Sequence, residues 1–337
     1  MKIAVDAMGG DNAPEINVLG AIHALKAKIA DEIVLVGDEN KIKAKLPKFF
    51  SKDIPISIIN TDQMIDMHES PAQACRQKKD ASIMICARLV KEGKVDAYVT
   101  AGNSGAAMAA ALINLRRIKG IHRPAIATMM PDKESKCLLL DVGANVDSKA
   151  KHLLQFAIMG SVYMEHICNV KNPKVGLLSI GEEDSKGNEL SLEAFELLKQ
   201  TPLNFVGNIE GRDIPQGLVD VVVCDGFVGN VVLKLAEGLA LTVLGLLKQE
   251  IKKNIVRIFG YGLLRGAFKT IKKKIDSNEY GGAPLLGIDG TVIISHGSSD
   301  ANGIKNAIRV AVESVKHNLP VEIDRKIKEY HAEDTNE

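Results

Sequence analysis

Short apolar runs that end in Gly, Asn or Asp alternate with longer stretches of helical spacing along most of the chain, and this alternation constrains the fold more than any other feature. It is typical of βα units built around a mostly parallel sheet. Strands are predicted at 3–6, 32–37, 56–59, 97–100, 125–129, 137–141, 175–180, 219–224 and 292–295. Helices are predicted at 81–91, 106–115, 153–167, 190–199, 231–248 and 304–317. The pattern therefore predicts an α/β fold.

The composition excludes several classes of protein. In 337 residues, 43 Lys and Arg against 42 Asp and Glu give a net charge of +1, which argues against a bulk nucleic-acid binder and against a disordered acidic chain. Five cysteines without a C-x-x-C pair fit a reduced, cytosolic chain. Asp6 interrupts any secretory leader, and the longest uncharged apolar run, 238–247, is too short to span a bilayer. We therefore expect a cytoplasmic protein with no membrane-spanning segment.

One segment, 248–274, interrupts the alternation. It holds nine Lys and Arg against a single acid, Glu250, a local charge of +8, so the rest of the chain carries −7. Apolar residues at three- to five-residue spacing could share one face of a helix there. This basic amphipathic segment is either a contact with a membrane surface or an acidic partner, or a solvated helix packed on the core or on a second subunit.

Candidate ligand-binding loops lie where predicted strands end and helices begin, because helix N-termini offer free N–H groups and a positive dipole end. Five such loops, 6–14, 100–105, 141–145, 225–230 and 295–300, are rich in Gly, Asn, Ser and Asp. Each could be a tight turn with a helix cap, but several together suit a phosphate. The candidate substrate-binding residues in and beside these loops are Asn103, Ser104, Asn145, Asn188, Asn208, Asp225, Asn230 and Ser298.

Three side chains are candidates for catalysis. Lys186, among acidic residues at 181–189, could neutralise a phosphate or an oxyanion, or simply belong to a solvated loop. Arg212 could hold phosphate through its planar fork, or form a surface pair with Asp213. His296 could act as an acid or base, or stabilise its turn.

Other kinds of site lack their motifs. The chain has no G-x-x-x-x-G-K-[ST], no G-x-G-x-x-G after a strand, no G-x-S-x-G and no metal spacing among its eight His. NAD, ATP, a serine triad and a metal are therefore poor candidates. Cys224, which closes a run of valines, is predicted to be a small buried hydrophobe rather than a nucleophile.

Nine ordered motifs give the chain a family resemblance nearly from end to end. They are DAMGGD at 6–11, AGNSGA at 101–106, RRIKGIHRP at 116–124, LDVGAN at 140–145, GEE with KG at 181–187, GNIEGRD at 207–213, DGFVGNV at 225–231, GGAPLLG at 281–287 and HGSS at 296–299. Together they resemble the bacterial acyl-acyl-carrier-protein:phosphate acyltransferases of phospholipid synthesis. Ser104 replaces the Thr common in that family, and both side chains carry a hydroxyl.

The resemblance implies transfer of a long fatty acyl group from the thioester of acyl carrier protein to inorganic phosphate, giving an acyl phosphate without a redox cofactor or metal. It implies a single three-layer α/β/α domain over 1–337, like phosphotransacetylases and isocitrate-dehydrogenase-type folds, with a helical protrusion at 231–280. It further implies a homodimer and peripheral attachment to the inner membrane, where a glycerol-phosphate acyltransferase would use the product.

The same resemblance suggests roles for the candidates. Lys186 and Arg212 would hold phosphate or stabilise charge, Asn and Ser side chains would donate to phosphate or to the thioester oxygen, and His296 would move a proton. The predicted membrane or carrier contacts are Arg257, Phe259, Leu263, Leu264 and Phe268. Two other functions stay open: a phosphotransacetylase that uses a short acyl-coenzyme A, and a non-catalytic scaffold that binds lipid or carrier protein.

Overall fold

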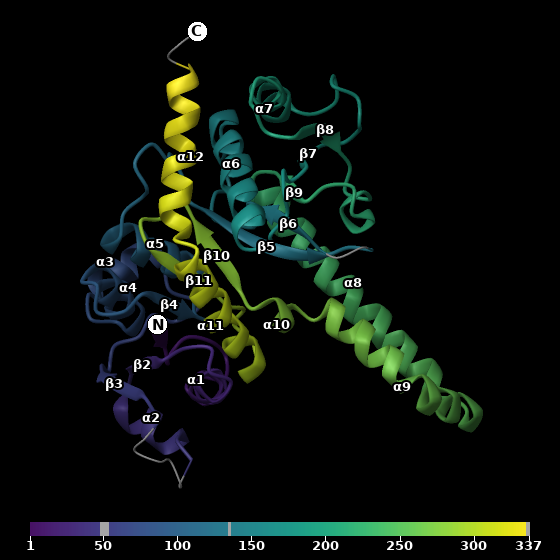
Figure 1. Ribbon diagram of the computed structural model, residues 1–337. Helices are drawn as coiled ribbons and strands as arrows, with labels where there is room; N and C mark the ends of the chain where they lie inside the picture. The colour runs from purple at the N-terminus through teal and green to yellow at the C-terminus, as the bar shows by residue number, and fades with distance from the viewer. Residues whose placement is uncertain (48–53, 134–135, 335–337) are drawn as a thin grey trace.

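A single mixed sheet of eleven strands forms the centre of the protein (Figure 1). The computed structural model describes residues 1–47, 54–133 and 136–334. The strands lie in the order β3-β2-β1-β4-β11-β10-β5-β6-β9-β7-β8. Their bounds are β1 Lys2–Asp6, β2 Glu32–Gly37, β3 Ile56–Asn60, β4 Ala97–Thr100, β5 Ala125–Pro131, β6 Lys136–Leu140, β7 Val175–Leu178, β8 Phe205–Ile209, β9 Val221–Val223, β10 Ala283–Leu286 and β11 Thr291–Ile294.

The sheet consists of two parallel groups that run in opposite directions. Strands β3, β2, β1, β4 and β11 are parallel to one another, and so are β6, β9, β7 and β8. Between the groups, β10 is antiparallel to both β11 and β5, and β5 is antiparallel to β6. Three reversals separate the groups, so they run in opposite directions. The pairing is staggered: the carboxyl end of β11 lies beside Ala283 of β10, and that of β6 lies beside Ala127 of β5, so the carboxyl ends of both groups face the middle of the sheet.

Helices cover both faces of the sheet, which gives the three layers (Figure 1). Helices α3, α4 and α5 pack on one face, α1 and α11 cover the first parallel group on the other, and α6, α7 and α12 cover the second group. The helices, with the short 3-10 turn η1 Ile214–Gln216, are α1 Glu15–Lys26, α2 Glu39–Lys45, α3 Pro71–Gln77, α4 Ser82–Lys91, α5 Ser104–Asn114, α6 Ala150–His166, α7 Glu189–Lys199, α8 Gly226–Lys252, α9 Ile255–Ile275, α10 Ser277–Tyr280, α11 Ala301–Lys316 and α12 Leu319–Asp334.

Side-chain alternation divides the hydrophobic core between the two faces. In β6, Leu138 and Leu140 pack beneath α6, whereas Cys137 and Leu139 join the core on the opposite face. A period of two is the consequence of the pleat, in which successive side chains point to opposite sides. Because both sides are covered, the central strands are apolar throughout, which is the pattern that predicted them.

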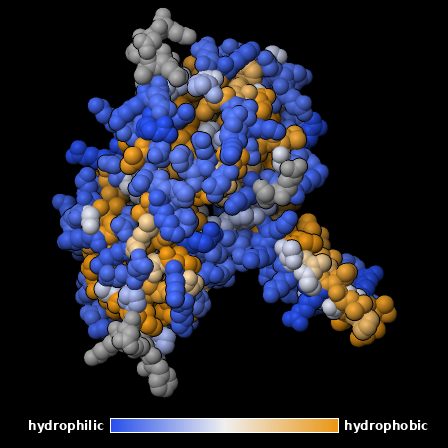
Figure 2. Space-filling view, viewed as in Figure 1, coloured by the Kyte–Doolittle hydropathy of each residue, from blue (hydrophilic) through white to orange (hydrophobic). Residues whose placement is uncertain are grey.

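Helices α8 and α9 form a hairpin that projects from the body (Figure 1). The chain turns at Lys253, and Asn254 caps α9 by accepting a hydrogen bond from the Val256 amide at 2.7 Å. Large hydrophobic side chains remain exposed along both helices, and Figure 2 shows them next to hydrophilic residues out to the tip. The hairpin overlaps the range 231–280, for which a helical protrusion was predicted, and the basic segment 248–274 is divided between the end of α8 and α9.

By length and composition, α8 could cross a membrane, with 27 residues and a mean hydropathy of 1.7 in its most apolar window. The helix is longer than the uncharged run 238–247, because it continues past Lys234 and Glu237 on one side and Lys248 on the other. Lys234 and Glu237 line a polar pocket beside β11, so the first half of α8 belongs to the α/β body.

All nine predicted strands are confirmed, and two more were missed. Strand β8 lies at the sheet edge, and only its last two residues, Asn208 and Ile209, are buried. Strand β10 follows two glycines and contains Pro284. Helices α1, α2, α3 and α12 were also not predicted. Proline lacks a backbone N–H and is disfavoured inside a sheet, which is why no strand was predicted there. Ala283 and Pro284 nevertheless pair with β11, and Leu285 and Leu286 pair with β5.

Candidate active site

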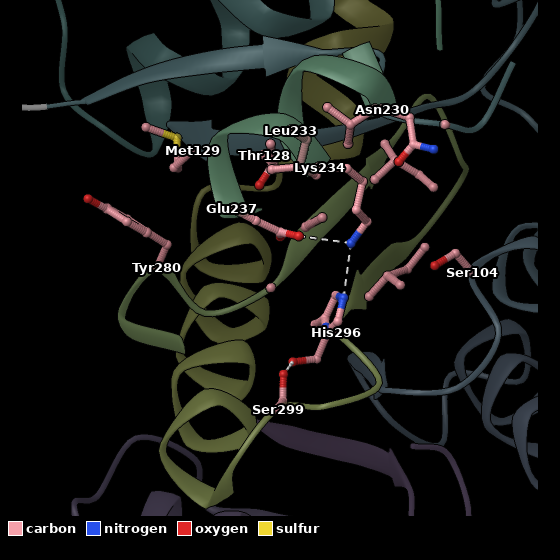
Figure 3. A pocket seen from close by; sticks show the side chains of 17 residues that line it. Ser104, Thr128, Met129, Asn230, Leu233, Lys234, Glu237, Tyr280, His296 and Ser299 are labelled. Atoms are coloured by element: carbon pink, nitrogen blue, oxygen red, sulfur yellow. Dashed lines mark hydrogen bonds and ion pairs between the residues drawn. The ribbon is translucent and has the colours of Figure 1, made fainter. Parts of the chain in front are cut away.

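A cavity of about 300 Å³ opens between the two parallel groups of strands (Figure 3). Its floor is formed by β5, β10 and β11, and its walls by α8 and the loops that follow β4, β6 and β11. The loops predicted at 100–105, 141–145, 225–230 and 295–300 each contribute to this cavity or hold its walls. The expectation that several strand exits meet at one place is therefore confirmed for four of the five loops.

Lys234 is the central cation of the pocket. Its ammonium lies 2.9 Å from the Glu237 carboxylate, one turn further along α8, and 3.1 Å from Nε2 of His296 (Figure 3). The other ring nitrogen, Nδ1, lies 2.7 Å from the hydroxyl of Ser298 and accepts a hydrogen bond from the Ser298 amide at 3.2 Å.

Hydroxyl and amide groups surround this charge. Ser104, in the first turn of α5, and Asn230, on α8, face the cavity (Figure 3). Ser299 lies beside the start of α11 and shares a 2.9 Å hydrogen bond with Ser295. Two helices thus begin at the rim, and their free N–H groups and dipoles favour an anion.

The remaining wall is apolar. Ile126 and Met129 of β5, Leu233 of α8 and Ile294 of β11 line it, with Tyr280 at one side. A cavity with one cation, several donors and an apolar wall can hold an anion next to a group that carries a hydrocarbon chain.

The position of α8 depends on close backbone contact with the loop after β6. A Cβ at Gly229 would lie 1.9 Å from the Asp141 carbonyl oxygen, and one at Gly226 would lie 2.5 Å from the Asn145 carbonyl oxygen. Gly226 also donates from its amide to that Asn145 oxygen at 2.9 Å. Only glycine permits this approach, which directs the next turns of α8, and therefore Asn230 and Lys234, into the cavity.

Asp141 organises that loop from beneath. Its carboxylate is fully buried and accepts hydrogen bonds from the amides of Ile126, Ala144 and Asn145 at 3.1, 3.0 and 2.7 Å. Burial raises the pKa of Asp141, and these hydrogen bonds oppose the rise. Burial likewise raises the pKa of Asp6, the last residue of β1. The hydroxyl of Thr100, at the end of the neighbouring strand β4, donates a hydrogen bond to its carboxylate.

The comparisons with known proteins agree over nearly the whole chain. The model of a family described as "Fatty acid synthesis protein" matches residues 1–322. A phosphate acyltransferase from Geotalea daltonii is 54% identical, covering 98% of this chain and 95% of the relative. One from Endomicrobium trichonymphae is 51% identical, covering 98% and 99%. The chain belongs to the bacterial phosphate acyltransferase family.

Solved structures show the same fold for this acyltransferase. A phosphotransacetylase from Streptococcus pyogenes superposes with a TM-score of 0.61 at 19% identity, over 94% of each chain. A branched-chain phosphotransacylase from Enterococcus faecalis gives 0.59 at 15% identity, over 93% of this chain and 99% of the other. The predicted likeness to phosphotransacetylases is therefore confirmed at the level of the fold.

The predicted site residues of the acyltransferase divide into two groups. Ser104, Asn230 and His296 line the pocket, and Ser298 contacts the His296 ring. The others have structural partners: Asn103, Asn188 and Asp225 cap α5, α7 and α8, and Asn145 donates to Pro124 and Asp141. Capping does not exclude substrate contact, so their binding roles stay predictions.

Lys186 and Arg212 do not line this cavity. They lie in the loops after β7 and β8, at the same edge as the loops that follow β6 and β9. With roughly 4.8 Å between neighbouring strands, β7 is about 10 Å from β6 and β8 about 14 Å. Arg212 pairs with Glu210 at 2.9 Å and Glu182 at 3.6 Å, not with Asp213. Asn208 donates to the Glu183 and Lys186 carbonyls and so holds this loop.

Sequence reasoning missed Lys234 and Glu237. A signal was available, because they are the only charged residues among the 22 from Gly226 to Leu247 and are three positions apart. In the part of the chain that the structure describes, no group of three or more His, Cys, Asp or Glu is placed to hold a metal ion. Cys224 is buried, as predicted, and burial raises its pKa.

Proposed function

We propose that this acyltransferase moves a fatty acyl group from the thioester of acyl carrier protein to inorganic phosphate, releasing an acyl phosphate and a free thiol. The observation that carries the proposal is the Lys234–His296 pair facing hydroxyl donors and an apolar wall within one cavity. The names of the relatives and the family model support an acyl group and phosphate. The donor and the product are our proposal.

In the proposed reaction, the Lys234 ammonium and the helix starts at Ser104 and Ser299 hold the phosphate. Glu237 and His296 keep the ammonium aimed at it. A phosphate oxygen forms a bond to the thioester carbon, and the carbon–sulfur bond breaks as the tetrahedral intermediate collapses. Donors such as Asn230 would stabilise the oxyanion, which is typically the largest catalytic contribution.

The leaving group explains why no strong acid is needed. A simple thiol has a pKa of about 8.5, so the thiolate departs with little help and takes a proton from solvent or from the His296 network. An acyl-enzyme is also unnecessary, because phosphate itself is the nucleophile. We retain Lys186 and Arg212 as proposed contacts for the donor arm, since their loops lie at the same strand edge as the pocket.

The test of the function follows thiol release from palmitoyl-carrier protein with and without phosphate. We expect release only when phosphate is present. Release without phosphate would indicate a thioesterase, no release in either case would favour the scaffold, and faster turnover of acetyl-coenzyme A would favour a phosphotransacetylase.

We also propose that α9 rests on the surface of the inner membrane. Phe259 and Leu263 are 71% and 75% exposed, and Leu264 and Arg257 are exposed beside them. Phe268 is partly buried against Tyr261, with the ring centroids 5.1 Å apart. Exposed apolar residues flanked by Lys and Arg suit an anionic lipid surface, where each cation contributes about 1 kcal/mol.

The membrane proposal is tested by liposome sedimentation. We expect the double variant Phe259→Asp, Leu263→Asp to lose binding to anionic vesicles, with thiol release from a soluble donor retained. Unchanged sedimentation would remove α9 as the membrane contact.

We propose that the exposed face of α8 forms the interface of a homodimer. Leu235, Leu239 and Val243 are more than half exposed. Such a stripe on a projecting helix fits a second copy of the hairpin. Sedimentation velocity of Leu239→Asp, Val243→Asp should then report a monomer; a dimer of unchanged stability would place the interface elsewhere.

A further inference from the structure

A second, strongly basic cavity lies outside the pocket described above. Its volume is about 630 Å³, roughly twice that of the pocket. It is formed by the loop between α5 and β5 and by the start of α6, and we name it the basic basin. Its ionisable lining residues are Arg117, His122, Arg123, Lys149, Lys151 and His152.

The basin contains no counter-charge. No Asp or Glu is among its lining residues. Within the described parts of the chain, 22 ion pairs form, and none involves Arg117, Arg123, Lys149 or Lys151. Four unpaired cations in one hollow repel one another, so the arrangement is favourable when an anionic partner occupies it.

The backbone beneath these cations is firmly held. Gln155 of α6 accepts from the His122 amide and donates to the Gly120 carbonyl, both at 2.8 Å. At the other end of the loop, the Ile118 amide donates to Gly287 at 3.1 Å, and the Arg117 guanidinium donates to the His122 carbonyl. A rigid loop presents its charges without an ordering cost on binding.

The His152 ring lies in the positive field of these cations. It is buried, its centroid is 6.1 Å from that of His122, and its Nδ1 accepts from the Lys149 amide at 3.1 Å. Its pKa is lowered, first by burial and then by the positive charges of Arg123, His122 and Lys149. A second proton is therefore disfavoured there, as expected beside unpaired cations.

The basin adjoins the catalytic pocket through two elements. Helix α5 has Ser104 in the pocket and Leu112 in the basin, eight residues or about 12 Å apart at 1.5 Å per residue. Strand β5 begins beside Pro124 in the basin and reaches the pocket at Ile126. A partner seated in the basin could therefore reach the pocket with a short flexible arm.

We infer that the basic basin is the docking surface for the acidic carrier protein that delivers the acyl group, separate from the membrane contact on α9. This inference rests on the proposed donor. The width of the basin and the spread of its cations over two elements suit several carboxylates on a protein surface better than one compact phosphate ion.

The test compares a variant with reversed charges in the basic basin with a control variant that has the same change in net charge elsewhere on the surface. The basin variant is Arg123→Glu, Lys149→Glu, Lys151→Glu, and the control is Lys26→Glu, Lys91→Glu, Lys171→Glu, whose side chains are exposed and far from either cavity in sequence. We expect the basin variant to raise the KM for palmitoyl-carrier protein at least about tenfold, as charge reversal at a docking surface does. The KM for phosphate, and kcat/KM for a carrier-free acyl-pantetheine thioester, should match the control.

Three results would overturn the inference. The first is a raised KM for phosphate with no change for the carrier, which would assign the basin to free phosphate. The second is an unchanged KM for the carrier in the basin variant, with a raised one in Arg265→Glu, Lys269→Glu, Lys272→Glu on α9. The third is equal loss with the carrier-free thioester, which would indicate damage to the pocket.

Direct binding separates this inference from the proposed function. Fluorescence anisotropy of labelled carrier protein measures docking without turnover. If wild type shows no phosphate-dependent thiol release but binds the carrier, and the basin variant alone loses binding, the proposed reaction fails and the docking surface stands. If wild type turns over and both variants bind equally, the docking surface fails.

Discussion

Lys234 is held in place by two neighbours of different character, and this arrangement determines what it can do. The Glu237 carboxylate pairs with the ammonium, and His296 fixes its direction across the cavity from α8 to the end of β11. A cation aimed in advance does not have to reorganise when negative charge develops on substrate. His296 was predictable because it follows a strand in a Gly- and Ser-rich loop. Lys234 was not predicted, because on an apolar helix its direction depends on how the helix packs.

Replacing Lys234 with Met should remove this charge while keeping the length of the side chain. We expect phosphate-dependent thiol release to fall about 100-fold, the usual loss when one preorganised donor is removed. Lys91→Met, at an exposed lysine on α4, is the matched control and should keep its rate. Equal rates for the two variants would place the chemistry elsewhere, with Lys186 the next residue to replace.

Asp141 predicts a pH dependence of stability. Burial raises its pKa above the ordinary 3.8, so the folded state binds its proton more tightly than the unfolded state. The corresponding stability is present below pH 3.8 and is lost as the pH rises through the raised value. In urea titrations, the free energy of unfolding of wild type minus that of Asp141→Asn should fall over this interval and then level off. A difference that grows with pH would mean a lowered pKa.

At the scale of the element, α8 has two tasks. Its first turns pack closely on the loop after β6 and carry the pocket residues, and its remaining turns leave the body as part of the hairpin. The sequence predicted a helix at 231–248 and a separate basic segment, but it did not predict that one element joins the site to the protrusion. The reason is that close approach at Gly229 involves Asp141, which is 88 positions away.

Two glycines of α8 make this division testable. A Cβ at Gly229 would lie 1.9 Å from a backbone oxygen, whereas a Cβ at Gly245 would have no atom within 4 Å. We expect Gly229→Ala to lower the free energy of unfolding by about 3 kcal/mol, as overpacking does, and to reduce thiol release. Gly245→Ala should raise it by about 0.5 kcal/mol through helix propensity. If urea unfolding gave equal values for both, α8 would not be anchored as described.

At the scale of the whole molecule, the site is a product of topology. Nine strands and the α/β class could be predicted from apolar runs and from the Gly, Asn and Asp residues that end them. The opposed directions of the two parallel groups could not, because the net reversal requires all three antiparallel pairs, β11–β10, β10–β5 and β5–β6, and β10 is a strand with a proline. That reversal brings loops from both groups to one cavity. The distribution of charge is also a property of the whole molecule, because the basic hairpin and the basic basin lie on a body that is otherwise acidic.

The central claim is that phosphate, held in this cavity, attacks the thioester directly. The most direct measurement supplies ¹⁸O-labelled phosphate and palmitoyl-carrier protein and identifies the acyl product by mass spectrometry. The account predicts an acyl phosphate that retains every labelled oxygen, in an amount equal to the thiol released, and its loss in Lys234→Met. Free palmitate without label would contradict it, because water would then be the nucleophile.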